Sequence, residues 1–412
     1  MYRKHRIVVL GAGYAGAYTA GNLARRLSPA DTEITVVNAE PVFVERLRMH
    51  QLATGQQIRA RRLADVFAGT GVRLRLGRVT AVDPARRTVS VTGGPGARSA
   101  AHDTLAHDTL GYDTLVYALG SHVADHGVPG VAEHAFNVTG RPAALRLRER
   151  LDGLAAGSTV LVVGEGLTGI ETAAEIAEAR PGLPVTLAAR GALGAQLSAG
   201  ARQHLHETFH RLGVTVREHT CVDAVEAARV RAADGSFLEA DATVWTAGFT
   251  VPAIAAACGL ETTASGQIVV DGTMRSLSHP EVYAVGDSVH ATGDNGLPMP
   301  MSCASAGSTS RQAVEAITAR LTGRPVANTR MDYFGNHISL GRRDGILQLV
   351  DDQARARSGY LGGRMAARIK AGVLKGSMWG VFHPTLGKPT RRRRLATTPR
   401  ERTGQSAGSR LG

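Results

Sequence analysis

The stretch Ile7–Gly16, IVVLGAGYAG, decides the fold of this chain. Its four apolar residues before the first glycine predict a strand of a parallel sheet, buried on both faces. The glycines then have separate tasks. Gly11 permits a tight turn, Gly13 lets the backbone approach a pyrophosphate, and Gly16 lets the next helix pack on the strand. A helix over 15–27 would direct its free N–H groups at the phosphates, so the stretch predicts a dinucleotide site.

A second strand over 33–38 ends at Asn38, about where a ribose-binding residue belongs. The same strand–turn–helix pattern returns later in the chain. A strand over 158–163 runs into Gly164–Gly169, GEGLTG, and a helix over 170–179 follows. Two such units in one chain predict two different dinucleotides, or one dinucleotide and one relic.

Length and composition limit the class of protein. The chain has 412 residues, enough for two to three domains. It contains no apolar run long enough to span a membrane, and the first strand begins at Ile7, so we expect a cytoplasmic protein without a signal peptide. Cys221, Cys258 and Cys303 lie far apart and form no CxxC pair, so structural thiols are expected.

The formal net charge is +13, and much of it lies late in the chain. Such a charge suits nucleic acid, an anionic membrane surface or a solvated tail. Because no nucleic-acid-binding signature accompanies it, no nucleic-acid partner is expected. Within 360–382, apolar residues recur four apart: Leu361, Met365, Ile369 and Val373. This stripe suits packing in the chain, a homodimer contact or peripheral contact at the inner face of the membrane; packing or dimer contact is favoured.

A short repeat, HDTL–AHDTL–GYDTL, occupies residues 102–115. We interpret it as a duplicated hairpin loop in which only the last copy continues as a strand, over 112–119. Its histidines and aspartates are the one candidate set of metal ligands: His102, Asp103, His107 and Asp108. No metal is expected.

Three further stretches each place an apolar strand before a glycine: LVYALGS (115–121), TVWTAGF (243–249) and PEVYAVGD (280–287). With the two glycine turns they occur in the order typical of two-dinucleotide-binding-domain flavoproteins, which the chain resembles to about residue 325. It is similar in particular to type II NADH:quinone oxidoreductases. Three segments carry that likeness: ERLRMHQLATG (45–55), GLTGIETAAE (166–175) and YFGNHISLGR (333–342).

The resemblance implies an α/β fold with two Rossmann-like domains. Expected are an FAD domain in two parts (1–120 and 251–325), an inserted NAD(P)H domain (121–250), a C-terminal α/β cap (326–387) and a basic disordered tail (388–412). The implied function is hydride transfer from NADPH or NADH to FAD, and electron transfer on to a quinone or quinone-like small molecule. The alternatives are a ferredoxin-type reductase, a soluble biosynthetic tailoring oxidoreductase and a non-catalytic redox-sensing flavoprotein.

The same resemblance suggests the site residues. Glu171 is the expected catalytic residue, with a first-turn helix glutamate as the alternative, and Glu175 is expected to be packed or solvated. Asp287 is implied to hydrogen-bond the ribityl chain of the flavin, and a role as a helix N-cap is compatible. Arg190 stands where an NADH-selecting acid is usual, so it favours NADPH. The expected cofactor-binding residues are Gly11, Gly13, Tyr14, Ala15, Gly16, Asn38, Arg46, Gln51, Val79, Ala118, Leu119, Gly120, Gly164, Gly166, Leu167, Thr168, Glu171, Arg190, Ala247, Gly248, Gly286, Asp287 and Ala304.

Overall fold

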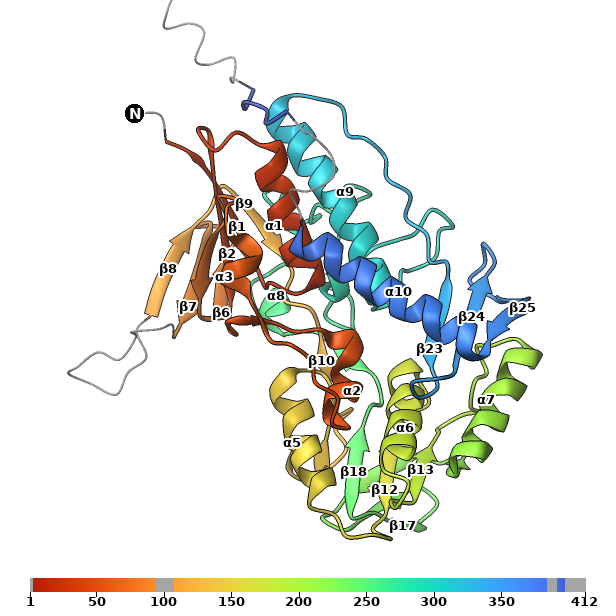
Figure 1. The fold of residues 1–412 in the computed structure, drawn as a ribbon. Helices are drawn as coiled ribbons and strands as arrows, with labels where there is room; N and C mark the ends of the chain where they lie inside the picture. The colour runs from red at the N-terminus through yellow and green to blue at the C-terminus, as the bar shows by residue number, and fades with distance from the viewer. Residues whose placement is uncertain (1–2, 94–106, 384–390, 397–412) are drawn as a thin grey trace, which may run out of the picture.

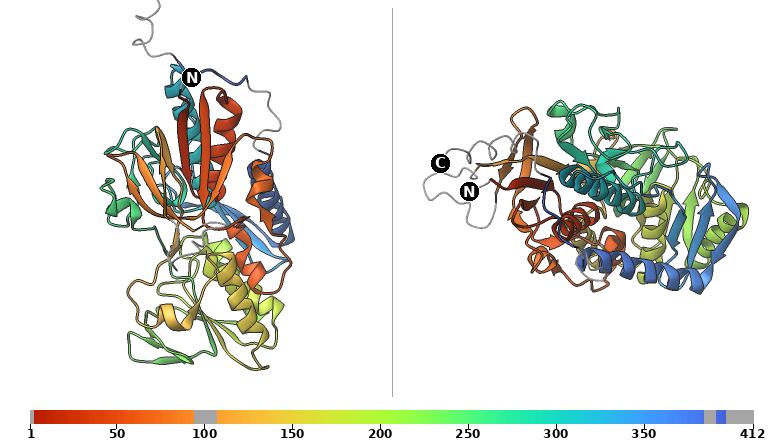
Figure 2. Two further views of the ribbon diagram at one scale, coloured as in Figure 1. Left: turned by 90° about the vertical axis from the view of Figure 1, so that its left-hand side faces the viewer. Right: turned by 90° about the horizontal axis from the view of Figure 1, so that it is seen from above.

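The computed structural model describes residues 3–93, 107–383 and 391–396. These residues form two five-stranded parallel sheets in separate halves of the molecule, together with smaller sheets (Figure 1 and Figure 2). The expected α/β class with two Rossmann-like units is confirmed.

The first sheet has β1 at its centre, in the order β21–β9–β1–β2–β5. Its strands are β1 (His5–Leu10), β2 (Thr32–Asn38), β5 (Arg73–Leu76), β9 (Thr114–Tyr117) and β21 (Val282–Ala284). The last four residues of β1 are buried, as its continuous apolar run predicts. Two helices, α1 (Tyr14–Arg26) and α9 (Cys303–Thr322), pack side by side next to this sheet (Figure 1). An antiparallel sheet shares its core: β6 (Arg78–Asp83), β7 (Thr88–Thr92) and β8 (His107–Gly111).

The second sheet repeats the arrangement, with β12 at its centre, in the order β11–β18–β12–β13–β14. Its strands are β11 (Ala135–Phe136), β12 (Val160–Val163), β13 (Val185–Ala188), β14 (Val214–Arg217) and β18 (Ala242–Trp245). The helices of this half are α5 (Arg141–Asp152), α6 (Leu167–Ala179) and α7 (Ala199–Leu212). The main core of this half lies between the sheet and these helices, and a smaller cluster lies between the sheet and β15 (Val222–Val225), β16 (Arg229–Ala232) and β17 (Phe237–Glu239).

The chain crosses between the two halves twice. At the crossing, β10 (His122–Val123) pairs with β19 (Phe249–Thr250) in antiparallel fashion. Since β21 then returns to the edge of the first sheet, the second sheet is inserted within the sequence of the first. The short elements are β3 (Val42–Phe43), η1 (Arg46–Arg48), α2 (Met49–Ala53), β4 (Arg61–Arg62), α3 (Leu63–Phe67), α4 (Val131–His134), α8 (Ile254–Ala257), β20 (Ile268–Val269), η2 (Gly286–Ser288) and β22 (Val289–His290).

The C-terminal part consists of an antiparallel sheet and a long helix. The elements are β23 (Gly335–Ser339), β24 (Gly345–Val350), β25 (Ala356–Gly362) and α10 (Gly363–Phe382). Helix α10 runs from α1 to β24 and so bridges the two halves (Figure 1). No helix in the described part of the chain combines the length and apolar character that crossing a bilayer needs.

Three expectations need correction. The second copy of the HDTL repeat also forms a strand, β8, because it pairs with β7. Within this strand, Asp108 forms an ion pair with Arg75. Two other candidate metal ligands, His102 and Asp103, lie outside the described residues. Leu361 belongs to β25, not to the helix, because its backbone pairs with Leu347.

Residues 391–396, within the tail expected to be disordered, are also ordered. Arg393 pairs with Leu27 in a parallel bridge, and Arg394 forms an ion pair with Asp31 at 2.7 Å. Backbone pairing and opposite charge together hold this segment beside the end of α1.

Candidate functional site

The first glycine turn, Gly11–Gly16, has the geometry that its sequence predicts. Gly11 has φ of +93°, and a Cβ there would collide with the carbonyl of Ala118. A Cβ on Gly16 would collide with the carbonyl of Gly11, so this glycine is needed for the helix to pack on the turn. A Cβ on Gly13 would meet nothing within 4 Å. Open space therefore lies beside the start of α1, where the sequence predicts a pyrophosphate.

The second glycine turn, Gly164–Gly169, repeats this geometry. Gly164 has φ of +120° and a Cβ there would lie 2.9 Å from the backbone of Thr246. A Cβ on Gly169 would collide with the carbonyl of Gly164, and one on Gly166 would again meet nothing within 4 Å. Both halves of the molecule thus present a glycine turn with an open side.

The two helices that follow these turns have no side-chain cap. Their N-cap residues are Gly13 and Gly166, and neither supplies an acceptor to the first N–H groups. By contrast, α7 and α9 are capped by the hydroxyls of Ser198 and Ser302. Unsatisfied N–H groups and the positive end of the helix dipole favour a phosphate. The local structure therefore fits a diphosphate-containing cofactor at each turn.

Near the first turn, predicted residues take part in two separate sets of hydrogen bonds. Asn38 Oδ1 accepts a hydrogen bond from the backbone N–H of Ala12 at 2.9 Å. The carboxylate of Asp287 accepts one from the Ser121 hydroxyl at 2.6 Å and lies 3.7 Å from Arg46. Arg46 also donates to the Ser121 carbonyl at 2.8 Å. Asp287 lies in η2 and α9 begins only at Cys303, so the N-cap alternative for Asp287 is wrong.

The remaining predicted residues of the first half lie on several elements. Tyr14 and Ala15 begin α1. A Cβ placed on Gly286 would lie 3.1 Å from the side chain of Ala15, so Gly286 is close to the start of this helix. Ala118 lies against Gly11, Leu119 and Gly120 follow at the end of β9, and Ala304 is exposed in the first turn of α9. Val79 is buried in the core on β6, and Gln51 Oε1 accepts from Arg48 Nε at 2.9 Å. In the second half, Leu167 and Thr168 begin α6, and Ala247 and Gly248 follow β18.

A buried charged cluster lies where α6, α10 and β23 meet. The carboxylate of Glu171 forms an ion pair with the ammonium group of Lys370 and accepts a hydrogen bond from the backbone N–H of Ser339 at 2.9 Å. Lys370 also donates to the carbonyl of His337 at 2.9 Å. Burial lowers the pKa of Lys370 to about 7. Burial thus favours the neutral amine of Lys370, whereas contact with the Glu171 carboxylate favours the charged form.

His50 and Glu175 lie beside this cluster. Burial, with a smaller contribution from Lys370, lowers the pKa of His50 to about 3, so its imidazole is neutral at physiological pH. Its Nε2 atom has no partner among the described residues. Glu175 is fully buried, and its Oε1 accepts from Gln56 at 2.6 Å and from Arg342 at 3.2 Å.

Sequence reasoning missed the part that Lys370 plays. It counted this lysine only as one of the late basic residues. The sequence of α10 did not reveal it, because only the structure shows that Ala366 and Lys370 are buried together on one face of the helix.

Arg190 is exposed and lies two residues after the end of β13. Its backbone N–H donates to Glu165 Oε2 at 3.1 Å, and Glu165 stands between two glycines of the second turn. The three cysteines are free, and burial raises the pKa of the Cys303 thiol to about 12.

Comparison with known proteins places this geometry in a family. The model of the pyridine nucleotide-disulphide oxidoreductases matches residues 5–312. The NADH dehydrogenase-like protein MT1860 of Mycobacterium tuberculosis is 31% identical over 363 residues, covering 82% of this chain and 86% of that protein. Demethylphylloquinone reductase NdbB of Synechocystis is 25% identical, and the match covers 83% of this chain and 86% of that protein. The structure of NDH2 from Plasmodium falciparum in complex with NADH superimposes with a TM-score of 0.74 at 14% identity, covering 93% of this chain and 98% of that one.

These matches confirm the resemblance, the fold and the cofactors that the sequence predicts. Two uncapped glycine turns suit the two dinucleotides of such an enzyme, one in each half of the molecule. The chain belongs to the pyridine nucleotide-disulphide oxidoreductase family and is an NAD(P)H-dependent flavoprotein oxidoreductase that binds FAD.

Proposed function

We propose that this oxidoreductase transfers electrons from NAD(P)H through FAD to a quinone or quinone-like small molecule. The observation that carries the proposal is the buried ion pair between Glu171 and Lys370, because reduction of a quinone consumes protons as well as electrons. The names of two relatives support it: the Synechocystis demethylphylloquinone reductase and a type II NADH:quinone oxidoreductase of Mycobacterium tuberculosis.

The glycine turns would hold the two cofactors. In this proposal the first turn and Asp287 hold FAD, and the second turn holds NAD(P)H. Bound FAD supplies the chemistry, by accepting hydride and passing electrons to the second substrate. Ser121 and Arg46 keep the Asp287 carboxylate in place through their contacts of 2.6 and 3.7 Å. Asn38 ties the end of β2 to the first turn and so keeps the turn open.

The proton balance assigns a task to Lys370. The overall reaction is NAD(P)H + H⁺ + quinone → NAD(P)⁺ + quinol, so one proton must come from the protein or the solvent. The Nζ atom of Lys370 holds a proton close to neutral pH, where a general acid is most effective. Glu171 would keep this group charged and oriented, because its carboxylate contacts Nζ directly.

Stopped-flow measurements under anaerobic conditions test the proposal. Glu171→Gln keeps the shape of the side chain and removes its charge. We expect flavin bleaching by NAD(P)H to change by less than about twofold, whereas turnover with menadione falls by about tenfold or more, because Lys370 is no longer held charged and oriented for proton transfer. Glu149→Gln, at an exposed position on α5, is the matched control and should leave both rates unchanged.

Two outcomes would contradict the quinone assignment. Faster turnover with a ferredoxin than with menadione would favour a reductase for a protein carrier. Flavin that NAD(P)H does not bleach would indicate a non-catalytic flavoprotein.

A further inference from the structure

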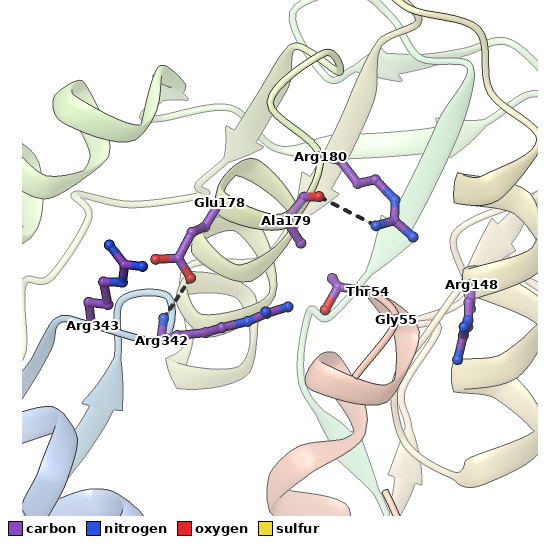
Figure 3. A pocket seen from close by; sticks show the side chains of 8 residues that line it. All are labelled: Thr54, Gly55, Arg148, Glu178, Ala179, Arg180, Arg342 and Arg343. Carbon is purple, nitrogen blue, oxygen red and sulfur yellow. Dashed lines mark hydrogen bonds between the residues drawn. The ribbon is translucent and has the colours of Figure 1, made fainter. Parts of the chain in front are cut away.

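A cavity of about 660 Å³ opens at the C-terminal end of α6 (Figure 3). Its walls come from four segments that are distant in sequence: the end of α2, helix α5, the end of α6 and the β23–β24 loop. The second glycine turn lies at the other end of α6. Since this helix has 13 residues, its two ends are separated by about 18 Å. The cavity is therefore distinct from the place predicted for the nicotinamide cofactor.

Four arginines line this cavity: Arg148, Arg180, Arg342 and Arg343. Glu178 is the acidic residue among the lining residues, and its carboxylate already accepts a hydrogen bond from the backbone N–H of Arg342 at 2.7 Å (Figure 3). The C-terminal end of α6 adds a partial negative charge. The four guanidinium charges still exceed the three carboxylates of Glu178, Asp152 and Glu175, so the cavity keeps a net positive charge that attracts anions.

The existing ion pairs leave part of this positive charge free. Arg148 and Arg180 share one partner, Asp152, at 3.6 and 2.5 Å. Arg342 contacts the buried Glu175 through Nε. Arg343 is exposed and has no carboxylate partner among the described residues. Arg343 and the loosely held Arg148 are therefore the guanidinium groups most able to turn toward a ligand.

A second, smaller hollow of about 340 Å³ shares Ala179 and Arg180 with the cavity. Its walls include the apolar side chains of Leu151, Leu154 and Leu183, together with the acidic residue Asp152. A charged compartment thus continues into a more apolar one. Ligand sites commonly combine an apolar surface with a few directed polar groups in this way.

We propose that the cavity and hollow together bind a nucleoside diphosphate or triphosphate. The phosphates lie among the four arginines, and the base lies in the hollow. Guanidinium groups suit this task, because their planar fork donates two parallel hydrogen bonds to phosphate oxygens. The cavity volume is within the range of small-molecule sites and far exceeds what a single inorganic phosphate fills.

Titration calorimetry with ADP tests the proposal. The FAD-loaded protein is first saturated with NAD⁺, so that ADP cannot enter the nicotinamide site, and ionic strength is kept constant. We expect one ADP site per chain. The double substitution of Arg148→Ser and Arg343→Ser should weaken ADP binding by about tenfold or more, because the loss of charged hydrogen bonds to the phosphates costs at least that much affinity in total.

Arg146→Ser is the matched control. Arg146 is exposed on the same helix as Arg148 and does not line the cavity, so its removal should leave ADP affinity unchanged. Flavin absorbance and Tm show whether each variant is folded. If the double variant does not fold, Arg343→Ser alone, at an exposed and unpaired position, should still weaken binding by several-fold.

Two results would overturn the proposal: no detectable ADP binding in the presence of NAD⁺, or equal ADP affinity in the double variant and the native protein. The same titration with pyrophosphate, which has no base, tests the hollow separately. Pyrophosphate binding as tightly as ADP would overturn the role of the hollow as a base site.

Discussion

Lys370 shows how burial alters the chemistry of one residue. On an exposed helix face this lysine would stay protonated throughout the physiological range. Between α10, β23 and α6 it is almost fully buried, and desolvation brings its pKa to about 7. Glu171 and the His337 carbonyl supply the partners that such a buried ammonium group needs.

The pKa of Lys370 predicts a pH dependence. As pH rises through its pKa of about 7, the fraction of Lys370 that is protonated and can donate falls. Turnover with menadione should therefore fall as pH rises through about 7, and Lys370→Met should remove this dependence. Flavin reduction by NAD(P)H, which needs no proton from Lys370, is the internal control. A flat native profile between pH 6 and 9 would contradict the assignment.

Arg190 carries a prediction about the choice of nicotinamide. We expect a higher kcat/KM for NADPH than for NADH, because an arginine after β13 can pair with the 2′-phosphate. Arg190→Ala should lower kcat/KM for NADPH by about tenfold, the usual range for a lost charged contact, and leave NADH unchanged. Steady-state kinetics with both cofactors provides the measurement. A strong NADH preference that persists in Arg190→Ala would end this proposal.

At the scale of elements, the two strand–turn–helix units differ in sequence yet share one geometry. In each, the first and third glycines contact backbone and the second faces open space. The reason is steric: a Cβ at the third glycine would lie inside the carbonyl of the first.

Two alanine substitutions in the second turn should therefore act differently. Gly169→Ala should lower Tm by several degrees, because its Cβ collides with backbone that cannot move freely. Gly166→Ala should leave Tm nearly unchanged and raise KM for NAD(P)H, because its Cβ enters the space predicted for the phosphates. The reverse pattern of thermal melting and kinetics would contradict these roles.

Helix α10 has an exposed apolar row. Met365, Ile369 and Val373 are 53%, 40% and 45% exposed, so packing within the chain, one of the favoured explanations for this stripe, is wrong for these three residues. Basic residues accompany the row: Arg364, Arg368 and Lys375. An exposed apolar row beside basic side chains is typical of a helix that lies on a membrane surface. We therefore propose contact with an anionic membrane surface.

Vesicle co-sedimentation tests the face of α10. The protein should bind vesicles that contain phosphatidylglycerol more strongly than pure phosphatidylcholine vesicles, and less strongly as salt rises. Replacing Met365, Ile369 and Val373 by serine should reduce binding several-fold. Leu277→Ser, at another exposed apolar position, is the control. A stable dimer that the triple substitution dissociates would favour the homodimer instead.

At the scale of the whole molecule, distant segments complete each half. Strand β21, which follows the second sheet in the sequence, completes the first sheet, and α10 brings Lys370 to Glu171 across 199 positions of sequence. The segment 391–396 then returns to the ends of α1 and α9 through Leu27, Asp31 and Leu321.

Truncation tests that last contact. Ending the chain after residue 383 removes the Arg394–Asp31 ion pair and the bridge at Leu27, and it should lower Tm by about 2 °C. Ending it after residue 396 keeps both contacts and should leave Tm unchanged. Equal melting temperatures for the two truncated forms would show that the segment adds nothing to stability.

Local pattern was enough to predict the glycine turns, their flanking strands and helices, and through them the family and its cofactors. These features depend on contacts within a few residues, such as a Cβ that would overlap a carbonyl one helical turn away. The same local pattern misjudged the second HDTL copy, because β8 exists only through its pairing with β7.

The ion pair of Glu171 with Lys370, the arginine cavity and the docking of 391–396 were decided by tertiary structure. Each of these features brings together segments that are far apart in the sequence, and the local sequence of the segments does not predict that they are in contact. The lowered pKa of Lys370 also depends on tertiary structure. It arises because the packing of α10 on the rest of the fold excludes water from the ammonium group.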